Sequence, residues 1–145
     1  MKKSDPPIIV EESFNLPIEA VWKSITELDY MKKWYFENIP EFKAEVGFKT
    51  NFMIEHDGRQ FPHYWEVLEV VPNQKITYRW TFPNYPGVGD VTFALTEQKD
   101  GTLITLTNVV IEDFPDDVPE FRRESCEGGW KYFIQERLKE YFENK

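Results

Sequence analysis

Few side chains in this sequence are suited to acid–base, nucleophilic or metal chemistry: two histidines, His56 and His63, and one cysteine, Cys126. Metal sites draw several His, Cys, Asp or Glu ligands together, and the two histidines do not converge in the strand register derived below, so we expect no metal. Cys126 and His63 facing each other across a cavity would suit nucleophilic catalysis, but a lone cysteine in a helix is more often a small core residue. The seven glycines form no phosphate-binding loop. We therefore expect no cofactor and recognise no catalytic constellation.

Adjacent carboxylates occur at Glu11-Glu12 and Asp116-Asp117. Neighbours in a strand point to opposite faces and those at a helix start face water, so neither pair has a catalytic arrangement. Glu66 and Glu69 on a long predicted strand are better placed, but a position on the solvent side or in a salt bridge explains them as well. Enzymatic activity stays open, and a non-enzymatic role is favoured.

The composition is typical of a folded domain. The chain has 145 residues, of which 41% are hydrophobic, with five Trp, seven Tyr and twelve Phe, and we expect a single domain over residues 1–145. No apolar run approaches the roughly 20 residues that span a bilayer and no signal sequence opens the chain, so we expect a cytoplasmic protein without membrane insertion. The net charge of −9 has the wrong sign for a nucleic-acid partner.

The order of predicted elements begins with a strand at Ile8 to Phe14. A helix follows Pro17, with Ile18, Val21, Trp22 and Ile25 on one apolar stripe, and a short second helix runs from Asp29 to Trp34. From Glu41 to Ile111 the period changes to two and strands dominate. A turn around Pro72-Asn73 joins the longest of them to a strand that contains Ile76, Tyr78, Trp80 and Phe82.

Two Asp-Gly pairs, Asp57-Gly58 and Asp100-Gly101, predict hairpins with two-residue turns. The first turn pairs His56 with Arg59, Ile54 with Phe61, Phe52 with His63, Thr50 with Trp65 and Phe48 with Val67. The second pairs Leu95 with Leu106, Phe93 with Asn108 and Val91 with Val110. Directly paired residues share a face, so His63 and Asn108 are polar exceptions on apolar faces. Such polar groups either form hydrogen bonds with neighbouring residues or orient a ligand. Arg79 or Tyr78 would join them if a bulge changes the phase of its strand.

The chain closes with a long predicted helix. The pattern Asp117-Val118-Pro119-Glu120 has the form of a capping box, and an apolar stripe follows with Trp130, Phe133, Ile134, Leu138 and Tyr141. This stripe must cover the sheet. Gly128-Gly129 inside the helix indicates either close approach of its backbone to the sheet or a ligand, or a kink. Residues 119–127 with the Phe114-Pro115 loop are candidates for a movable lid.

Motifs in a fixed order extend over nearly the whole chain. They are Leu16-Pro17 with Val21-Trp22, then Trp34, Val46-Gly47-Phe48, Trp65-Glu66-Val67 leading into Pro72, Ile76-Thr77-Tyr78-Arg79-Trp80, residues 100–106 (DGTLITL) and Gly129-Trp130. With these motifs the sequence resembles the START-like (SRPBCC) helix-grip superfamily, and within it the homologues of the heat shock protein 90 ATPase activator. The resemblance implies an α+β fold: a curved antiparallel sheet of six or seven strands, two short helices after the first strand, and a long C-terminal helix packed across the sheet.

Three functions are compatible with this pattern. The first is a binding module for a small hydrophobic or aromatic molecule. The residues expected to line its apolar cavity are Trp22, Trp34, Phe52, His63, Trp65, Trp80, Phe93, Asn108, Cys126 and Trp130. The second is a cyclase- or hydrolase-type enzyme with His63 as general base and Asn108 or Arg79 stabilising negative charge. The third is a chaperone-interacting protein that uses the acidic segment Glu112 to Glu127, and the oligomeric state stays open.

Overall fold

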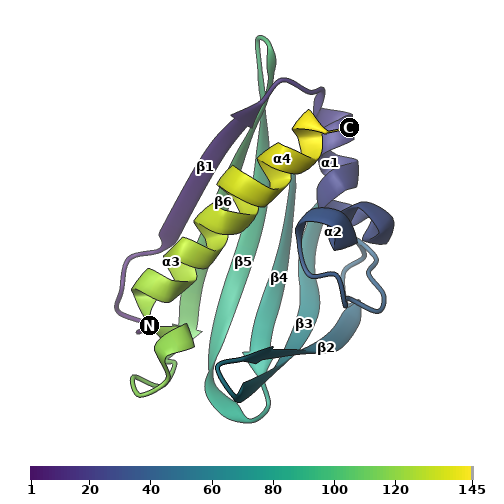
Figure 1. Ribbon diagram of the computed structural model, residues 1–145. Coiled ribbons are helices and arrows are strands. Elements are labelled where there is room, and N and C mark those ends of the chain that lie inside the picture. The colour runs from purple at the N-terminus through teal and green to yellow at the C-terminus, as the bar shows by residue number, and fades with distance from the viewer. Residues whose placement is uncertain (145) are drawn as a thin grey trace.

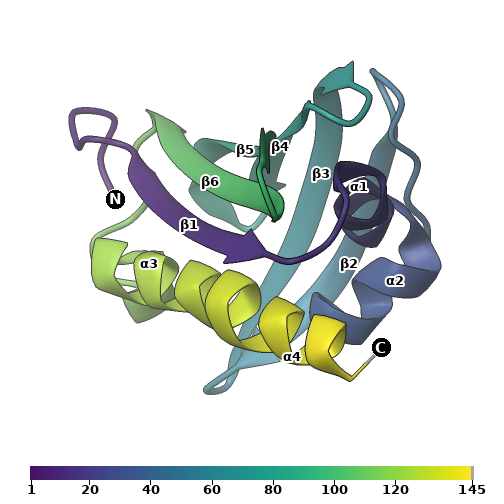
Figure 2. The ribbon, with the colours of Figure 1, turned by 90° about the horizontal axis from the view of Figure 1, so that it is seen from above.

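The computed structural model describes residues 1–144 and has two layers, a curved antiparallel sheet and a helical layer on its concave side. Six strands lie in the order β1-β6-β5-β4-β3-β2, so β1 and β2 form the edges. The C-terminal helix runs diagonally across the sheet, and α1 and α2 lie beside its far end (Figure 1; Figure 2). This is the α+β helix-grip arrangement that the sequence predicts, with six strands.

The element order also agrees with the prediction. It is β1 (Ile8–Phe14), α1 (Ile18–Thr26), α2 (Leu28–Trp34), β2 (Lys49–His56), β3 (Arg59–Val71), β4 (Lys75–Phe82), β5 (Tyr85–Gln98) and β6 (Gly101–Glu112), followed by the helical residues from Pro119 to Glu143. Residues 41–48, expected within the strand region, form no strand. No helix among residues 1–144 is long and apolar enough to cross a bilayer.

The hairpin β2–β3 has the predicted register. Asp57 and Gly58 have φ angles of 50° and 78°, as a type I′ turn requires. His56 lies opposite Arg59, and Phe52 lies opposite His63. His63 is therefore placed on the concave face among apolar side chains.

The register predicted for the hairpin β5–β6 is wrong by two residues. The turn residues are Lys99 and Asp100, and Gly101 is the first residue of β6. As a result Phe93 pairs with Leu106, and Val91 pairs with Asn108. Gly101 is needed here for another reason, because a Cβ at this position would collide with the carbonyl of Phe14. Since side chains alternate with a period of two, a shift of two residues leaves every side chain on its predicted face.

The helical region begins differently from the prediction. Residues Pro119–Phe121 form a short 3-10 helix, η1, whose N-cap makes no side-chain hydrogen bond, so the capping box does not form. Arg122 has an extended backbone, and α3 (Arg123–Lys131) begins after it. The helix then continues through a π-helical segment, η2 (Tyr132–Arg137), into α4 (Leu138–Glu143).

The glycine pair Gly128-Gly129 produces neither a kink nor a close contact of the helix backbone with the sheet. The chain bends at Arg122, and α3 continues without interruption through both glycines. A Cβ at either position would meet no atom within 4 Å, so close packing of the backbone does not require glycine.

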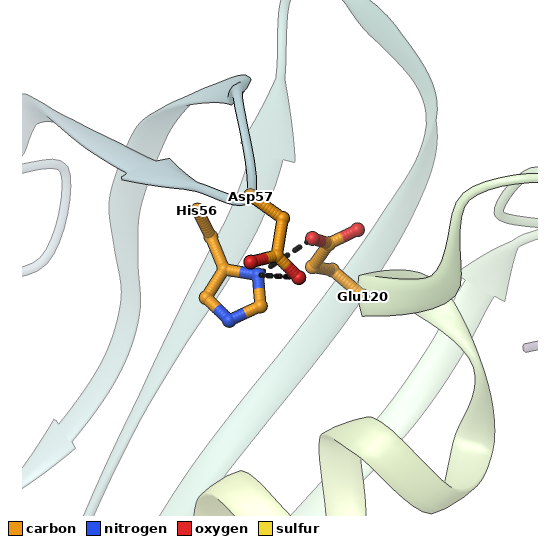
Figure 3. A group of neighbouring side chains, drawn as sticks. All are labelled: His56, Asp57 and Glu120. Carbon is orange, nitrogen blue, oxygen red and sulfur yellow. Dashed lines mark hydrogen bonds and ion pairs between the residues drawn. The ribbon is translucent and has the colours of Figure 1, made fainter.

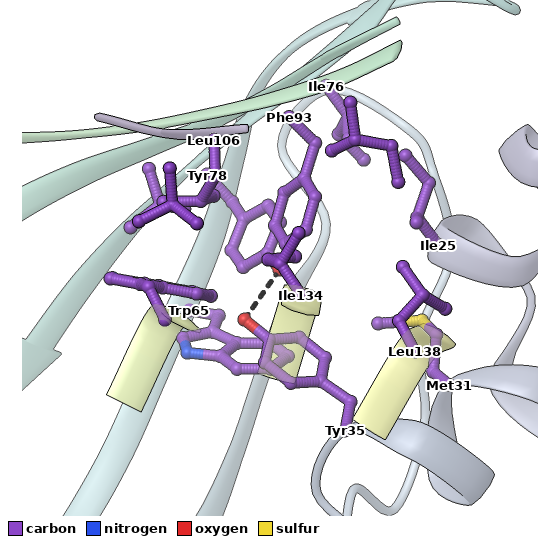
Figure 4. Packing of buried hydrophobic residues seen from close by; sticks show 14 of the residues in the cluster. Ile25, Met31, Tyr35, Trp65, Ile76, Tyr78, Phe93, Leu106, Ile134 and Leu138 are labelled. Atoms are coloured by element: carbon purple, nitrogen blue, oxygen red, sulfur yellow. Dashed lines mark hydrogen bonds between the residues drawn. The ribbon is translucent and has the colours of Figure 1, made fainter. Parts of the chain in front are cut away.

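A filled core occupies the half of the concave face that lies under η2, α4 and α2. Trp34, Tyr78, Ile134 and Leu138 are fully buried there, and Figure 4 shows several of these side chains in close packing. The hydroxyls of Tyr35 and Tyr78 form a buried hydrogen bond of 3.0 Å. Burial raises the pKa of both tyrosines, so both remain protonated and the pair is structural.

Candidate functional site

The other half of the concave face contains a cavity of about 510 Å³. It lies between the strands β3 to β6, the helix α3 and the segment η1, and side chains of the β2–β3 hairpin tip stand at its mouth. Most of the lining is apolar or aromatic. The lining residues are Met1, Phe36, Ile54, His56, Asp57, Phe61, His63, Trp80, Phe82, Gly89, Val91, Asn108, Phe114, Pro119, Glu120, Phe121, Ser125, Cys126, Gly129, Trp130 and Phe133. A cavity of this size and composition is typical of a small-molecule site.

The structure divides the ten predicted ligand residues into two groups. Five of them line the cavity: His63, Trp80, Asn108, Cys126 and Trp130. The other five are not part of its lining: Trp34, Phe52, Trp65 and Phe93 are buried, and Trp22 is partly buried against the core. The sequence pattern could not separate these two groups. It gives the face of the sheet or helix on which a side chain lies, and both groups lie on the concave side of the sheet.

Several lining residues lie in segments without a regular period, where sequence patterns give little information. Phe36 follows α2, Phe114 lies in the loop after β6, and Phe121 ends η1. Phe114 and Phe121 stack with ring centroids 5.1 Å apart. The segment that we expected to act as a lid therefore forms an aromatic wall of the cavity. Its aromatic residues are the sequence signal from which this position in the wall could have been predicted.

His63 is the most buried histidine of the described chain, with only 8% of its surface exposed. Its ring stacks on Phe52, with centroids 5.1 Å apart, and meets Trp80 and Phe82 edge-on. Its Nδ1 lies 2.8 Å from the carbonyl oxygen of Phe61. Burial lowers the pKa of His63 to about 4, so the ring is neutral near pH 7.

Asn108 and Cys126 face each other across the sheet–helix gap. The Nδ2 of Asn108 donates a hydrogen bond to Sγ of Cys126 at 3.2 Å. Burial raises the pKa of the Cys126 thiol to about 11, so this group is a protonated thiol and not a reactive thiolate near neutral pH. The pair offers a polar but uncharged wall.

The charged side chains of the lining gather at the cavity mouth, whereas the N-terminal ammonium of Met1 is buried and donates to the carbonyl oxygen of Phe121 at 2.9 Å. Arg59, beside the β2–β3 turn, donates two hydrogen bonds to the carboxylate of Glu120 on η1, at 2.8 and 2.7 Å. Nδ1 of His56 lies 2.7 Å from Oε2 of Glu120 and 3.6 Å from Asp57 (Figure 3). The hydrogen bonds from Arg59 lower the pKa of Glu120 to about 2. The hydrogen bond with Glu120 in turn raises the pKa of His56. We call Arg59, His56 and Glu120 the mouth cluster.

The side chains of His56, Asp57 and Glu120 are close enough together to share a metal ion. The sequence did not foresee this grouping, because Glu120 lies far along the chain. Arg59 engages both oxygens of Glu120, however, so its cationic guanidinium already occupies the position that a metal would need. The arrangement fits an ion-pair cluster better than a metal centre.

The positions of Arg79 and of the acidic segment bear on the enzyme and chaperone hypotheses. Arg79 pairs with Asp90 through two hydrogen bonds and is not part of the cavity lining, so it does not face His63. In the segment Glu112 to Glu127, Asp116 pairs with Lys2 and Glu120 with Arg59. Part of its charge is thus used within the fold.

The sequence profile of the family described as activator of Hsp90 ATPase homolog 1-like protein matches residues 15–143. No protein among those with curated function matches the chain. Because the profile match spans nearly the whole chain, the chain belongs to this family.

Solved structures share the fold. Protein MLL2253 from Mesorhizobium loti is 26% identical with a TM-score of 0.76, and the alignment covers 97% of this chain and 98% of that one. Protein BH1534 from Bacillus halodurans is 27% identical with a TM-score of 0.72, covering 94% and 96% of the two chains. The Aha1 dimer from Colwellia psychrerythraea is 19% identical with a TM-score of 0.73, covering 94% and 95%, which shows a common fold.

Proposed function

We propose that this member of the activator of Hsp90 ATPase homolog family binds a small, mainly apolar molecule in the cavity between its sheet and α3. The observation that carries the proposal is the uneven filling of the concave face. One half is packed with buried side chains, and the other half keeps about 510 Å³ of space with apolar walls. Open apolar space costs packing energy, and a bound ligand would recover it.

Binding without catalysis agrees best with the groups present. A general base works well when its pKa lies near the working pH, and His63 with a pKa of about 4 is a weak base at neutrality. Cys126 is protonated, and Arg79 is paired with Asp90 outside the cavity. We therefore place His63, Trp80, Asn108, Cys126 and Trp130 in a binding role.

The test is thermal unfolding with a panel of fatty acids, sterols, flavonoids and polyketide-like aromatics. A ligand at a hundred times its Kd adds about 2.7 kcal/mol of stability, which raises the Tm of a domain of this size by roughly 5–10 °C. No shift with any compound, confirmed by calorimetry, would count against the proposal.

Gly128 and Gly129 provide a matched pair of variants. Gly129 lines the cavity and Gly128 is exposed, and a Cβ at either site meets no atom within 4 Å. Both Gly→Leu changes should stabilise α3 by up to about 1 kcal/mol, because leucine is the better helix former. Only Gly129→Leu should occupy cavity space and abolish the ligand-induced shift. An unchanged shift in Gly129→Leu would place the ligand elsewhere.

A second candidate function rests on the family's description, which names an activator of the Hsp90 ATPase. We propose chaperone contact as the alternative to ligand binding. Stimulation of Hsp90 ATPase activity by the purified chain at low salt would support it. Stimulation that persists in Gly129→Leu would show that chaperone contact is independent of the cavity.

A further inference from the structure

His63 presents one defined hydrogen-bonding atom to the cavity. A carbonyl oxygen can only accept a hydrogen bond, so Nδ1 must carry the proton that it donates to Phe61. In a neutral imidazole the other nitrogen, Nε2, is then an acceptor. Among the described residues the structure gives Nε2 no hydrogen-bond partner.

Trp80 lies beside His63 in the cavity wall and contributes its ring. The indole lines the cavity, edge-on to His63 with centroids 5.4 Å apart. Its Nε1 is buried without a hydrogen-bond partner among the described residues, as is Nε1 of Trp65 in the filled core. An atom without accessible surface cannot donate to a ligand in the cavity, so His63 supplies the polar contact here.

The other polar groups of the lining are engaged within the fold. The amide of Asn108 donates to Sγ of Cys126. The N-terminal ammonium of Met1 donates to the carbonyl oxygen of Phe121 at 2.9 Å, and His56 and Glu120 are paired at the mouth. Nε2 of His63 is not engaged in this way and is free to accept a hydrogen bond from a ligand.

We propose that the cavity selects ligands that carry a hydroxyl group, which donates a hydrogen bond to Nε2 of His63. A hydroxyl is a small uncharged donor, so it can engage this acceptor without bringing a charge among the aromatic walls. The inference rests on the proposed function, since it names the chemical class that the same cavity takes. His63 acts here as the specificity-determining residue.

The experiment compares two probes with the same ring system, naphthol and its methyl ether. Calorimetry near neutral pH should give naphthol a Kd about tenfold lower than that of the ether, since a tenfold change in Kd corresponds to 1.4 kcal/mol, within the range of one hydrogen bond. Equal binding of naphthol and ether would overturn the inference while leaving the proposed function intact.

The variant His63→Phe keeps the aromatic ring and removes the acceptor. It should lose the preference for naphthol and bind naphthol and the ether with similar Kd values. A preference that persists in the variant would overturn the role of His63. If the wild type binds another compound of the panel but neither naphthol nor the ether, the inference fails and the proposed function stands; if no compound of the panel binds, both fail.

A spectroscopic measurement on the wild type is independent of whether the variant folds. The ¹⁵N resonance of His63 Nε2 should have the shift of an unprotonated nitrogen, and it should move upfield when naphthol donates a hydrogen bond to it. Naphthol binding that leaves this resonance unchanged would contradict the proposed contact.

Discussion

At the scale of single residues, His63 shows how burial determines chemistry. An exposed histidine titrates near pH 6.5, but the rings of Phe36, Phe52, Trp80 and Phe82 surround this one and exclude water. The cost of burying a charge lowers its pKa to about 4. His63 is therefore a neutral, fixed acceptor and not a proton shuttle.

The lowered pKa of His63 predicts acid sensitivity. Between pH 6.5 and pH 4 the unfolded state binds a proton at this site and the folded state does not, so the free energy of unfolding falls as the pH falls through this window. From pH 7 to about pH 4.5 the loss from His63 should be about 2–3 kcal/mol. Urea unfolding at both pH values measures it.

His63→Phe is the control for this prediction. His56 and the carboxylates titrate in both proteins, so the difference between the two pH dependences isolates His63. The variant should lose about 2–3 kcal/mol less than the wild type over the same interval. Identical pH dependences would show that His63 titrates alike in the folded and unfolded states.

At the scale of elements, the mouth cluster joins two segments that are far apart in the sequence. The tip of the β2–β3 hairpin carries Arg59 and His56, and η1 carries Glu120. The side chain of Glu120, predicted to cap a helix, reaches across to the hairpin. The cluster thereby links the two segments that border the opening of the cavity.

Glu120→Gln should loosen this link and ease passage of the ligand. The change removes the charge that holds Arg59, so we expect ligand association and dissociation to accelerate together. Kd should stay within about twofold, because glutamine keeps the size of the side chain at this position of the lining. The Arg59–Glu120 pair lies at the surface and is only partly buried, so solvent screens it and the free energy of unfolding should fall by about 1 kcal/mol. Stopped-flow fluorescence of the tryptophans measures both rates.

Asp117→Asn is the matched control, since it removes one carboxylate from the neighbouring loop and Arg59 does not contact Asp117 among the described contacts. Its ligand kinetics should equal those of the wild type. Equal acceleration in both variants would assign the effect to net charge and not to the mouth cluster.

At the scale of the whole molecule, the concave face is divided between a filled half and an open half. The filled half joins η2, α4 and α2 to the sheet through fully buried side chains such as Trp34, Ile134 and Leu138. Over the open half, α3 spans the cavity and is anchored mainly by Trp130, its one buried residue. Local opening is easiest where few buried contacts hold an element.

Amide hydrogen exchange should reveal this division. In the free protein the amides of α3 and of the β2–β3 hairpin tip should exchange faster than those of the β5–β6 pair, because the open half has fewer buried contacts. A ligand in the cavity should slow exchange in α3 and the hairpin tip and leave the filled half nearly unchanged. Protection spread evenly over the chain would argue against a ligand held in the open half.

The sequence by itself determined the element order, the fold class and the face of each strand residue. Hydrophobic period and turn chemistry are local properties, and a face is preserved even when a register is wrong by two, as at Asn108. For the same reason His63 and Asn108 could be identified as polar groups on apolar faces. Membership of the family follows from motifs spread over most of the chain.

Only the tertiary structure decided where space remains on the concave face. Trp34, Trp65 and Phe93 are aromatic and face the same side as Trp80 and Trp130, but the former fill the core and the latter border the cavity. The mouth cluster likewise required the fold, because Glu120 meets Arg59 across 61 residues of sequence. Voids and long-range ion pairs depend on how elements that are far apart in the sequence pack together. A local sequence pattern does not contain the distances between such elements.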